Sequence, residues 1–569
     1  MDVPRIVSRL RAAGAAFLLG AAAACTAEPD NPADLVLMNG KIVTVDETLP
    51  EAQALAVVGD RIVAIGGDAD IEDWIGSDTE VIDLAGLTAI PGFIEGHGHF
   101  SGIGSAQLQL NLMDVANWDE IVRMVADAVA EAEPGELITG RGWHQEKWDP
   151  APEPNVDGLP FHDALSAVSP DNPVILTHAS GHATYANARA MELAGIDAST
   201  RDPAGGEIVR DGGGNPIGAF RETAGGLLGP ARRGAARADP RRVLELAQEE
   251  VISNGITSFQ DAGSGFATVD LLKEMADDGT LKLRMWVMLR VGNETLAERL
   301  PDARLIGYGG DRLTVRAIKV SLDGALGSHG AWLLEPYTDL PASTGLGRDV
   351  DELAETARLA IENDFQLCVH AIGDRANREV LDVYQEAFEA HPDRTGLRWR
   401  IEHAQHLHPD DIPRFGDMGV IASMQGIHCT SDGPWVEPRL GERRAGEGAY
   451  MWQDLMRSGA VVSNGTDAPV EDVSPIASYY ATVTRMMDTG EAFYPDQKMS
   501  RLEGLRSYTL NAAYAAFEDD IKGSLTVGKL ADITVLTKDI MTVPDAELPT
   551  TEIAYTIIGG EVVYTGGGM

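Results

Sequence analysis

Cysteine and positive charge are both scarce in this sequence. The 569 residues include three cysteines, and 45 lysines and arginines stand against 88 aspartates and glutamates, which gives a formal net charge of −43. Three cysteines cannot form a framework of several disulfides, so a hydrophobic core must hold the fold together. An excess of negative charge this large repels a phosphate backbone and excludes nucleic acid as a partner. The hydrophobic fraction of 44 % is ordinary for a globular protein with a sizeable core.

The sequence also lacks an apolar run long enough to span a membrane, and only its N-terminus has the pattern of a membrane-targeting segment. Three arginines within the first 11 residues precede a short apolar run over 15–24, and Cys25 follows. This layout is typical of a secretory signal, and the run is too short to span a bilayer. The small residues before Cys25 resemble a bacterial lipoprotein processing site, although alanine stands where leucine is usual. We therefore predict a signal or lipoprotein signal over 1–25 and a linker over 26–33. The protein is then exported, either periplasmic or tethered to the envelope by a lipid on Cys25.

Short β-like segments occupy both ends of the remaining chain. Apolar stretches flank the turn pairs Asn39-Gly40 and Gly59-Asp60 near the start and Gly559-Gly560 near the end, and such pairs favour hairpins. Neither end has enough strands to bury a face by itself. We therefore expect the segments 34–90 and 521–569 to pair into one accessory β-sandwich.

Between these ends, short apolar strands alternate with amphipathic stretches, which indicates βα units and a parallel sheet. Eight such strands predict a TIM-like (β/α)₈ barrel over 91–520. The interval between the first two strands is too long for one loop and predicts a large insertion at about 101–250. The eight predicted strands are 87–94, 256–259, 283–288, 315–320, 366–370, 399–403, 419–423 and 460–463.

The candidate metal ligands lie near the ends of these strands. His97 and His99 are two residues apart, so in extended chain both imidazoles point to the same face. His370 ends the fifth strand, His403 ends the sixth and Asp467 follows the eighth. Barrel active sites gather residues from the C-terminal ends of several strands. Imidazole and carboxylate together are the ligand set of Zn²⁺ and similar divalent ions, so the pattern predicts a shared metal site.

Lys319 lies within an apolar strand, where an ammonium group is disfavoured unless it is neutralised. Carboxylation to a carbamate would turn it into an anion that can bridge two metals. Alternatively, its stem is buried while its head reaches water. Periodicity alone does not choose between the two.

The motifs taken together resemble the amidohydrolase superfamily, in particular the amidohydrolase-3 branch that includes N-substituted formamide deformylases. The resemblance extends from residue 34 to the end of the chain. The matching motifs are Pro91-Gly-Phe-Ile-Glu-Gly-His-Gly-His99, Ser180-Gly-His-Ala183, Gly255-Ile-Thr-Ser258, Lys319-Val-Ser-Leu-Asp-Gly324, His370-Ala-Ile-Gly-Asp-Arg375, Glu402-His403, Ser423-Met-Gln425, Gly465-Thr-Asp-Ala-Pro469 and Gly523-Ser-Leu-Thr-Val-Gly-Lys-Leu-Ala-Asp532.

This resemblance implies a ligand set. His97 and His99 would bind one metal together with Asp467, and His370 and His403 would bind a second. Carboxylated Lys319 would bridge the two ions, with zinc expected and one or two ions per chain. The family's usual aspartate two residues before the first metal histidine is Glu95 here, which leaves the ligands intact.

The resemblance also implies the hydrolysis of a non-peptide C–N bond in a small molecule, such as an amide, formamide, carbamate or cyclic amide. A bound metal supplies hydroxide near neutral pH, Asp467 is the expected proton carrier, and His182 would bind the substrate carbonyl or the oxyanion.

Two alternatives remain open: a deaminase of the same fold, and a catalytically silent metal- or ligand-binding envelope protein. Deaminases usually carry a glutamate three residues after the fifth-strand histidine, and Gly373 stands there. A substrate carboxylate has its candidate partners in Arg210, Arg221 and Arg375, although ion pairing within the protein is the more common fate of a single arginine.

Overall fold

The computed structural model describes residues 31–233 and 239–567. The predicted signal over 1–25 and most of the predicted linker lie outside these residues, and so does the predicted lipid site at Cys25. Within the described part of the chain, no helix combines the length and apolar character needed to cross a bilayer.

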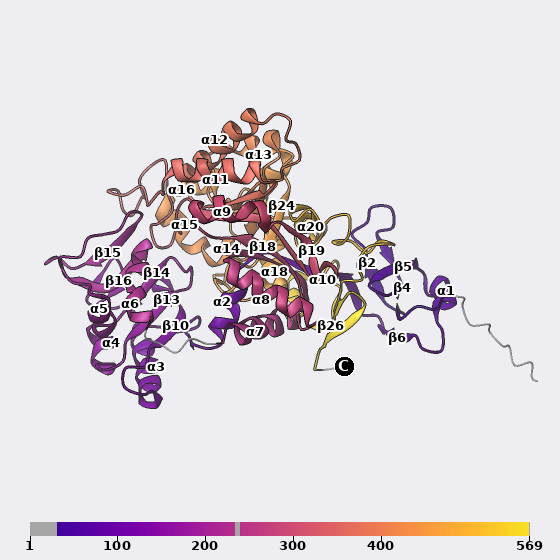
Figure 1. The fold of residues 1–569 in the computed structure, drawn as a ribbon, viewed down its shortest axis with the longest axis horizontal. Coiled ribbons are helices and arrows are strands. Elements are labelled where there is room, and N and C mark those ends of the chain that lie inside the picture. Colours follow the sequence, from indigo (N-terminus) through magenta and orange to yellow (C-terminus); the bar gives the residue numbers. More distant parts are fainter. Residues whose placement is uncertain (1–30, 234–238, 568–569) are drawn as a thin grey trace, which may run out of the picture.

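A parallel barrel of eight strands forms the centre of the molecule (Figure 1). Neighbouring strands pair in sequence order, and the first and last strands meet at a tight contact that nearly closes the ring. The TIM-like barrel predicted from the alternating pattern is therefore confirmed. Its strands are β8 (Phe93–Gly98), β17 (Ile256–Ser264), β18 (Arg284–Leu289), β20 (Leu313–Ser321), β21 (Gln366–Ala371), β22 (Arg400–His403), β23 (Ile421–Gln425) and β24 (Val462–Gly465).

The predicted first barrel strand over 87–94 is wrong in its bounds. The chain forms two strands there, β7 (Thr88–Pro91) and β8, which belong to different sheets. Gly92 separates them, and a Cβ at this position would overlap the side chain of Thr257. The apolar run continues across the break because both strands are buried, so periodicity could not reveal it.

Helices cover the outside of the barrel because one face of each carries apolar residues at helical spacing. In α11 the buried residues include Leu353, Ala357 and Ala360, and the Asp349 side chain caps its N-terminus by accepting from the N–H of Asp351 at 2.9 Å. The helices of the barrel region are α2 (Phe100–Ala106), α7 (Pro240–Ser253), α8 (Phe266–Asp277), α9 (Asn293–Ala303), α10 (Tyr308–Asp311), α11 (Val350–Glu362), α12 (Asp374–Ala390), α13 (Ile412–Met418), α14 (His428–Ser431), α15 (Gly433–Leu440), α16 (Glu442–Gly448), α17 (Trp452–Arg457), α18 (Pro475–Thr484), α19 (Arg501–Ser507) and α20 (Leu510–Ala515).

Two further sheets lie at one end of the molecule, where the indigo and yellow ends of the chain meet in Figure 1. One sheet has the order β5-β4-β1-β6, and the other has the order β27-β26-β25-β7-β2-β3 and joins strands from both chain ends. Apolar side chains of both sheets form one buried cluster that includes Leu35, Val57, Ile533 and Ile557. The elements are β1 (Leu35–Met38), β2 (Lys41–Val43), β3 (Glu51–Ala52), β4 (Ala54–Val58), β5 (Arg61–Gly66), α1 (Asp68–Ile71), β6 (Glu80–Asp83), β25 (Ile533–Leu536), β26 (Ile553–Ile558) and β27 (Glu561–Thr565).

The turn pairs in this region do not all make hairpins. Strands β4 and β5 pair antiparallel around Gly59-Asp60, and β26 and β27 pair around Gly559-Gly560. The hairpin expected at Asn39-Gly40 is wrong, because β1 and β2 belong to different sheets. A Cβ at Gly40 would overlap Leu84, so this glycine allows the chain to cross between the two layers.

Residues between β8 and α7 form a separate sheet with the order β15-β16-β14-β13-β10-β9 and its own buried aromatic cluster, including Trp118, Trp143 and Trp148. It lies at the opposite end of the molecule from the sheets of the chain ends (Figure 1). Its elements are β9 (Leu110–Asn111), α3 (Trp118–Glu131), β10 (Ile138–Trp143), β11 (Asn155–Val156), β12 (Leu159–Pro160), α4 (Asp163–Val168), β13 (Val174–His178), β14 (Ala183–Ala186), α5 (Ala188–Ala194), β15 (Gly206–Arg210), β16 (Pro216–Glu222) and α6 (Gly229–Arg232).

Closure of the barrel depends on glycine at position 96. A Cβ there would overlap the backbone carbonyl of Asn464 in β24, and backbone cannot move aside as a side chain can. We predict that Gly96→Ala lowers the free energy of unfolding by about 1–3 kcal/mol, measured by chemical denaturation. Gly212→Ala is the matched control, because nothing lies within 4 Å of its Cβ position. Equal stability of the two variants would contradict the tight contact.

Candidate metal centre

His97, His99 and Asp467 come together at the C-terminal ends of β8 and β24. The Nε2 atom of His99 lies 3.1 Å from Oδ1 of Asp467, and Nε2 of His97 lies 3.6 Å from the same oxygen. These three side chains can each offer one ligand atom within a sphere of metal-binding size. The structure therefore brings the ends of the first and eighth strands to one point, as the barrel prediction requires.

The remaining predicted ligands lie around the same point. Lys319 Nζ is 3.3 Å from Nε2 of His97. The ring of His403 lies 4.8 Å from that of His97 and 4.4 Å from that of His370, measured between centroids. His370, His403 and Lys319 are all buried. All six predicted metal-site residues thus form one continuous cluster.

The backbone at this cluster is unusual. His403 has a φ of 77° and Asp467 a φ of 59°, so both lie in the left-handed region that non-glycine residues rarely adopt. Backbone strain of this kind persists only where the surrounding structure enforces it, and it is concentrated at functional sites.

A buried ion pair beneath the cluster orients His97. Glu402 is fully buried and pairs with Arg400, whose Nε donates to Oε1 of Glu402 at 2.6 Å. The other carboxylate oxygen of Glu402, Oε2, contacts Nδ1 of His97. Arg400 also donates to the carbonyl of Gly96 at 2.7 Å and to the hydroxyl of Ser423 at 2.7 Å. Because Glu402 engages Nδ1, the Nε2 of His97 is directed toward Asp467 and Lys319.

The electrostatics of the cluster suit metal ligation. Burial, followed by the nearby charge of Lys319, lowers the pKa of His97 to about 4, so its imidazole is neutral at physiological pH. Burial lowers the pKa of Lys319 to about 8. Burial raises the pKa of Asp467, but interactions with His99 and His97 outweigh it and hold this pKa well below the usual range. Neutral imidazole and ionised carboxylate are the forms that bind a divalent ion.

Unpaired polar atoms in this cluster provide a test of fit for a metal. Among the residues that the structure describes, Asp467 Oδ1 and His370 Nε2 are buried and have no hydrogen-bond partner. His370 Nε2 is 3.4 Å from Asp323, but the alignment does not make a hydrogen bond. Buried polar atoms are almost always satisfied, so these two point to a ligand. The nitrogen and oxygen donors around them fit Zn²⁺ or a similar ion.

Glu95, at the position where the family pattern has aspartate, binds the chain rather than the cluster. Its Oε1 accepts from the N–H of Thr466 at 2.6 Å and from that of His97 at 3.2 Å, and its Oε2 accepts from the Thr466 hydroxyl at 2.9 Å. Burial raises its pKa to about 8. The longer side chain ties β8 to the loop that carries Asp467 and leaves the predicted ligands in place.

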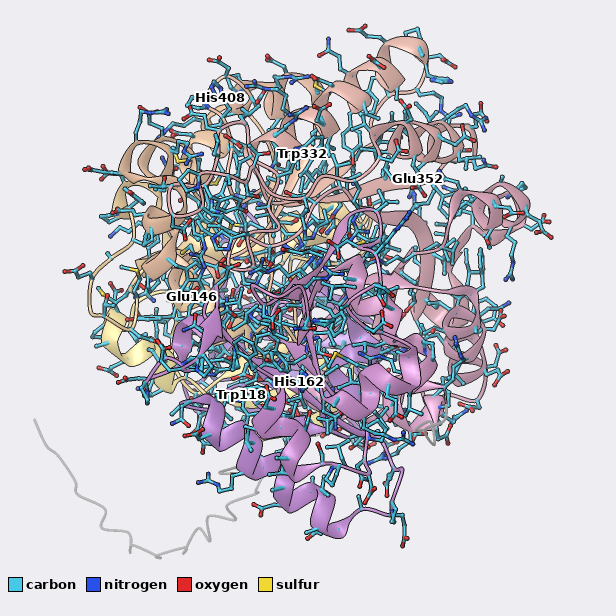
Figure 2. The ribbon with its side chains drawn as sticks, turned by 90° about the vertical axis from the view of Figure 1, so that its left-hand side faces the viewer. Trp118, Glu146, His162, Trp332, Glu352 and His408 are labelled. Atoms are coloured by element: carbon cyan, nitrogen blue, oxygen red, sulfur yellow. The ribbon has the colours of Figure 1, made fainter. Side chains whose placement is uncertain are left out.

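His182 reaches the cluster from the insertion. Its ring lies 5.0 Å from that of His370, and its Nδ1 donates to Oε2 of Glu222 at 2.8 Å. Arg141 joins the two parts of the molecule nearby, since its Nε donates to the carbonyl of Pro469 at 3.0 Å. Figure 2 views the molecule from this side, with Trp118 of the insertion below Trp332 of the barrel region. The insertion therefore covers the C-terminal end of the barrel.

Two residues of the site, His428 and Gln425, could not be picked out from the sequence. His428 is buried and can share a metal position with His403 and Asp467. Gln425 accepts from Nδ1 of His403 at 2.7 Å and so directs its other nitrogen. Gln425 lay within a recognised motif, and His428 follows it by three residues, but one histidine among 13 carries no signal of its own.

The arginines considered for a substrate carboxylate are paired within the protein. Arg210 lies 2.7 Å from Asp202, Arg221 contacts Asp157 and Glu207, and Arg375 lies 3.4 Å from Glu379. Each of these three arginines therefore forms an ion pair within the protein, which is the more common role of a single arginine.

Cys368 lies inside the barrel in a small buried cluster with Trp286 and Met288, and both described cysteines are free.

A family model described as the amidohydrolase family matches residues 80–564. The chain belongs to the amidohydrolase family. It is 34 % identical to Protein LONG AFTER FAR-RED 3 of Arabidopsis thaliana over 94 % of this chain and 92 % of that protein. It is 28 % identical to the N-substituted formamide deformylase of Arthrobacter pascens over 93 % of this chain and 98 % of that one.

A solved structure, an uncharacterised metal-dependent hydrolase of Pyrococcus horikoshii, superposes with a TM-score of 0.71 at 26 % identity and covers 90 % of this chain and 99 % of its own. The resemblance predicted from the motifs is confirmed. Together with the histidine and aspartate cluster, family membership supports a metal-dependent hydrolase.

The ion pair beneath the cluster generates a stability prediction for this amidohydrolase. Arg400→Met would leave Glu402 buried without its positive partner, so we expect the free energy of unfolding to fall by about 3–5 kcal/mol. Arg443→Met is the control, because Arg443 pairs with Glu335 on the surface and such pairs contribute about 1 kcal/mol or less. Denaturant unfolding of both variants measures the difference, and an equally small change in both would contradict the role of Arg400.

Proposed function

We propose that this amidohydrolase hydrolyses a non-peptide C–N bond of a small molecule, in an amide, formamide, carbamate or cyclic amide. The observation that carries the proposal is the convergence of four histidines, one lysine and one aspartate at the barrel's strand ends. Within the described residues, two buried ligand atoms of this cluster are left unpaired. In this proposal the accessory sheets and the insertion are separate units, and the insertion supplies His182 to the site. The N-terminal pattern supports a place in the bacterial cell envelope.

His97, His99 and Asp467 would hold one divalent ion, with zinc expected. His370 and His403 would hold a second ion, with carboxylated Lys319 between the two. When bound, such an ion acidifies water and polarises a carbonyl group. Formation of a carbamate requires the neutral amine, and the lowered pKa of Lys319 makes that form accessible near neutral pH.

The side chains around the cluster provide the proton transfers. Asp467 Oδ1 is buried, makes no hydrogen bond within the described residues and is ionised, so it can accept a proton from the attacking water and pass it to the leaving nitrogen. Glu222 accepts from Nδ1 of His182 and so orients its ring, and His182 would bind the substrate's carbonyl oxygen or the oxyanion.

The deaminase alternative receives no support from position 373. A Cβ at Gly373 would overlap the backbone of Trp332, so the glutamate that those enzymes usually carry there would not fit.

The alternative of a catalytically silent binding protein is tested by measuring turnover. A screen of the metal-loaded chain against formamides, N-acyl amino acids, carbamates and cyclic imides should find a hydrolysed substrate, whose turnover stops on chelation and returns with Zn²⁺. Persistent hydrolysis in the chelated chain would contradict the metal-dependent proposal.

We predict that His97→Ala and Asp467→Asn each reduce kcat/KM by at least about a hundredfold and lower the bound metal, while the circular dichroism spectrum is unchanged. His408→Ala is the matched control, because the His408 side chain is partly exposed and lines a pocket that includes none of the predicted metal ligands. Metal content is read by mass spectrometry. Near-wild-type activity in either site variant would remove the metal-site argument.

Lys319 gives a sharper prediction. Lys319→Ala should lose much of its metal and activity, and formate or acetate at high concentration should restore part of the rate by replacing the bridging anion. Lys319→Arg should also be inactive, because arginine keeps the positive charge but cannot form a carbamate. An active Lys319→Arg variant with a full metal complement would defeat the two-metal proposal.

A further inference from the structure

Three arginines border the candidate metal centre on the side of the insertion. Arg141 belongs to β10 of the insertion sheet, Arg290 directly follows β18, and Arg348 precedes α11. All three line a single pocket, and His99 and His182 line the same pocket. We call Arg141, Arg290 and Arg348 the arginine cluster. Three separate segments of the chain therefore bring guanidinium groups to the edge of the proposed reaction centre.

Within residues 31–233 and 239–567, none of these guanidinium groups has an acidic partner. No carboxylate oxygen there lies within 4.0 Å of a side-chain nitrogen of the arginine cluster, although the chain has 88 acidic residues against 45 basic ones. The contrast with Arg210, Arg221 and Arg375 is direct, since each of those forms an ion pair.

Neutral groups hold two members of the arginine cluster in place. Arg141 donates to the carbonyls of Pro469 and Ala179 at 3.0 and 2.8 Å, and Arg290 donates to the Ser321 hydroxyl at 3.1 Å. Arg348 is anchored through its backbone, whose N–H donates to the carbonyl of Leu322 at 2.8 Å. The side-chain contacts position the guanidinium groups of Arg141 and Arg290 without neutralising their charge.

The charges within the pocket favour an anion. Burial, followed by the charge of Arg348, lowers the pKa of Arg290, so the two positive groups are close enough to repel each other. Glu222 is the one carboxylate among the residues that line this pocket, against three guanidinium groups. Its Oε2 accepts from His182, while its Oε1 makes no hydrogen bond within the described residues. Asp467 belongs to the candidate metal centre. Glu352, labelled in Figure 2, lines the neighbouring pocket beside Arg348 and Arg290 without pairing with either.

We propose that the arginine cluster binds a carboxylate of the substrate, and that the substrate class is therefore an N-acyl or N-formyl amino acid. This inference rests on the proposed hydrolysis of a C–N bond. Because His99 and His182 line the same pocket, the carboxylate would be held next to the bond that breaks. Planar guanidinium groups bind carboxylates through paired N–H donors, which fixes orientation as well as charge.

The reaction balances without a further co-reactant. Water adds its oxygen to the acyl carbon, the C–N bond breaks, and the nitrogen takes a proton. The products are the free acid and the amino acid, and the substrate's carboxylate is unchanged throughout.

The first test compares an N-acetyl amino acid with its carboxamide, which has the same shape but no charge, across N-formyl and N-acetyl series. We expect the full-length wild-type chain to prefer the carboxylate in kcat/KM by about ten- to hundredfold, and Arg348→Gln to reduce that preference by at least about tenfold. Arg375→Gln, an arginine already paired with Glu379, is the matched control and should keep the preference. A preference unchanged in Arg348→Gln would overturn the assignment.

The second test measures binding without turnover. Titration calorimetry of the same pair of compounds on the full-length Asp467→Asn chain should show tighter binding of the carboxylate, and Arg348→Gln in that background should remove the difference. Equal binding of the N-acetyl amino acid and its carboxamide would overturn the assignment of the arginine cluster as a carboxylate site. This holds even if the wild-type chain hydrolyses the N-acetyl bond of the carboxamide. Selective carboxylate binding with no hydrolysis of any compound would instead refute the proposed function and leave the anion site standing.

Discussion

The buried pair of Arg400 and Glu402 is the interaction on which the centre of this protein depends. Its guanidinium joins four barrel strands, since Arg400 on β22 also bonds to Gln260 on β17, to Gly96 on β8 and to Ser423 on β23. Glu402 in turn fixes the orientation of His97. Strand packing and the direction of a candidate ligand are therefore set by the same charges, so a change that loosens one also disturbs the other.

Much of this arrangement could be predicted from the sequence. The barrel followed from the alternation of apolar strands and amphipathic helices, and the cluster followed from His97, His99, His370, His403 and Asp467 at strand ends. These features share one rule: parallel strands of a barrel deliver their C-terminal residues to one place. A local pattern combined with that rule predicts long-range proximity without any pairwise contact being known.

The features that could not be predicted depend on contacts that do not alter the hydrophobic periodicity of the sequence. The break at Gly92 lies within a continuous apolar run, and the crossing at Asn39-Gly40 uses a residue pair that elsewhere makes hairpins. Arg141 and Arg348 could not be distinguished from the paired Arg210 and Arg221, because an ion pair is a property of the folded arrangement. Only the structure separates arginines that have partners from those that do not.

The sheet that joins both chain ends has a consequence for the order of synthesis. Strand β7 pairs with β25, and at this junction Phe93 bonds to Thr534, 441 positions further along the chain. A ribosome builds a chain from its N-terminus, so β2, β3 and β7 must wait until nearly the whole polypeptide has emerged before this sheet can be completed. Contacts of such long range slow folding and leave apolar strands exposed meanwhile. The nascent chain would therefore depend on chaperones during its synthesis more than the size of its barrel alone would suggest.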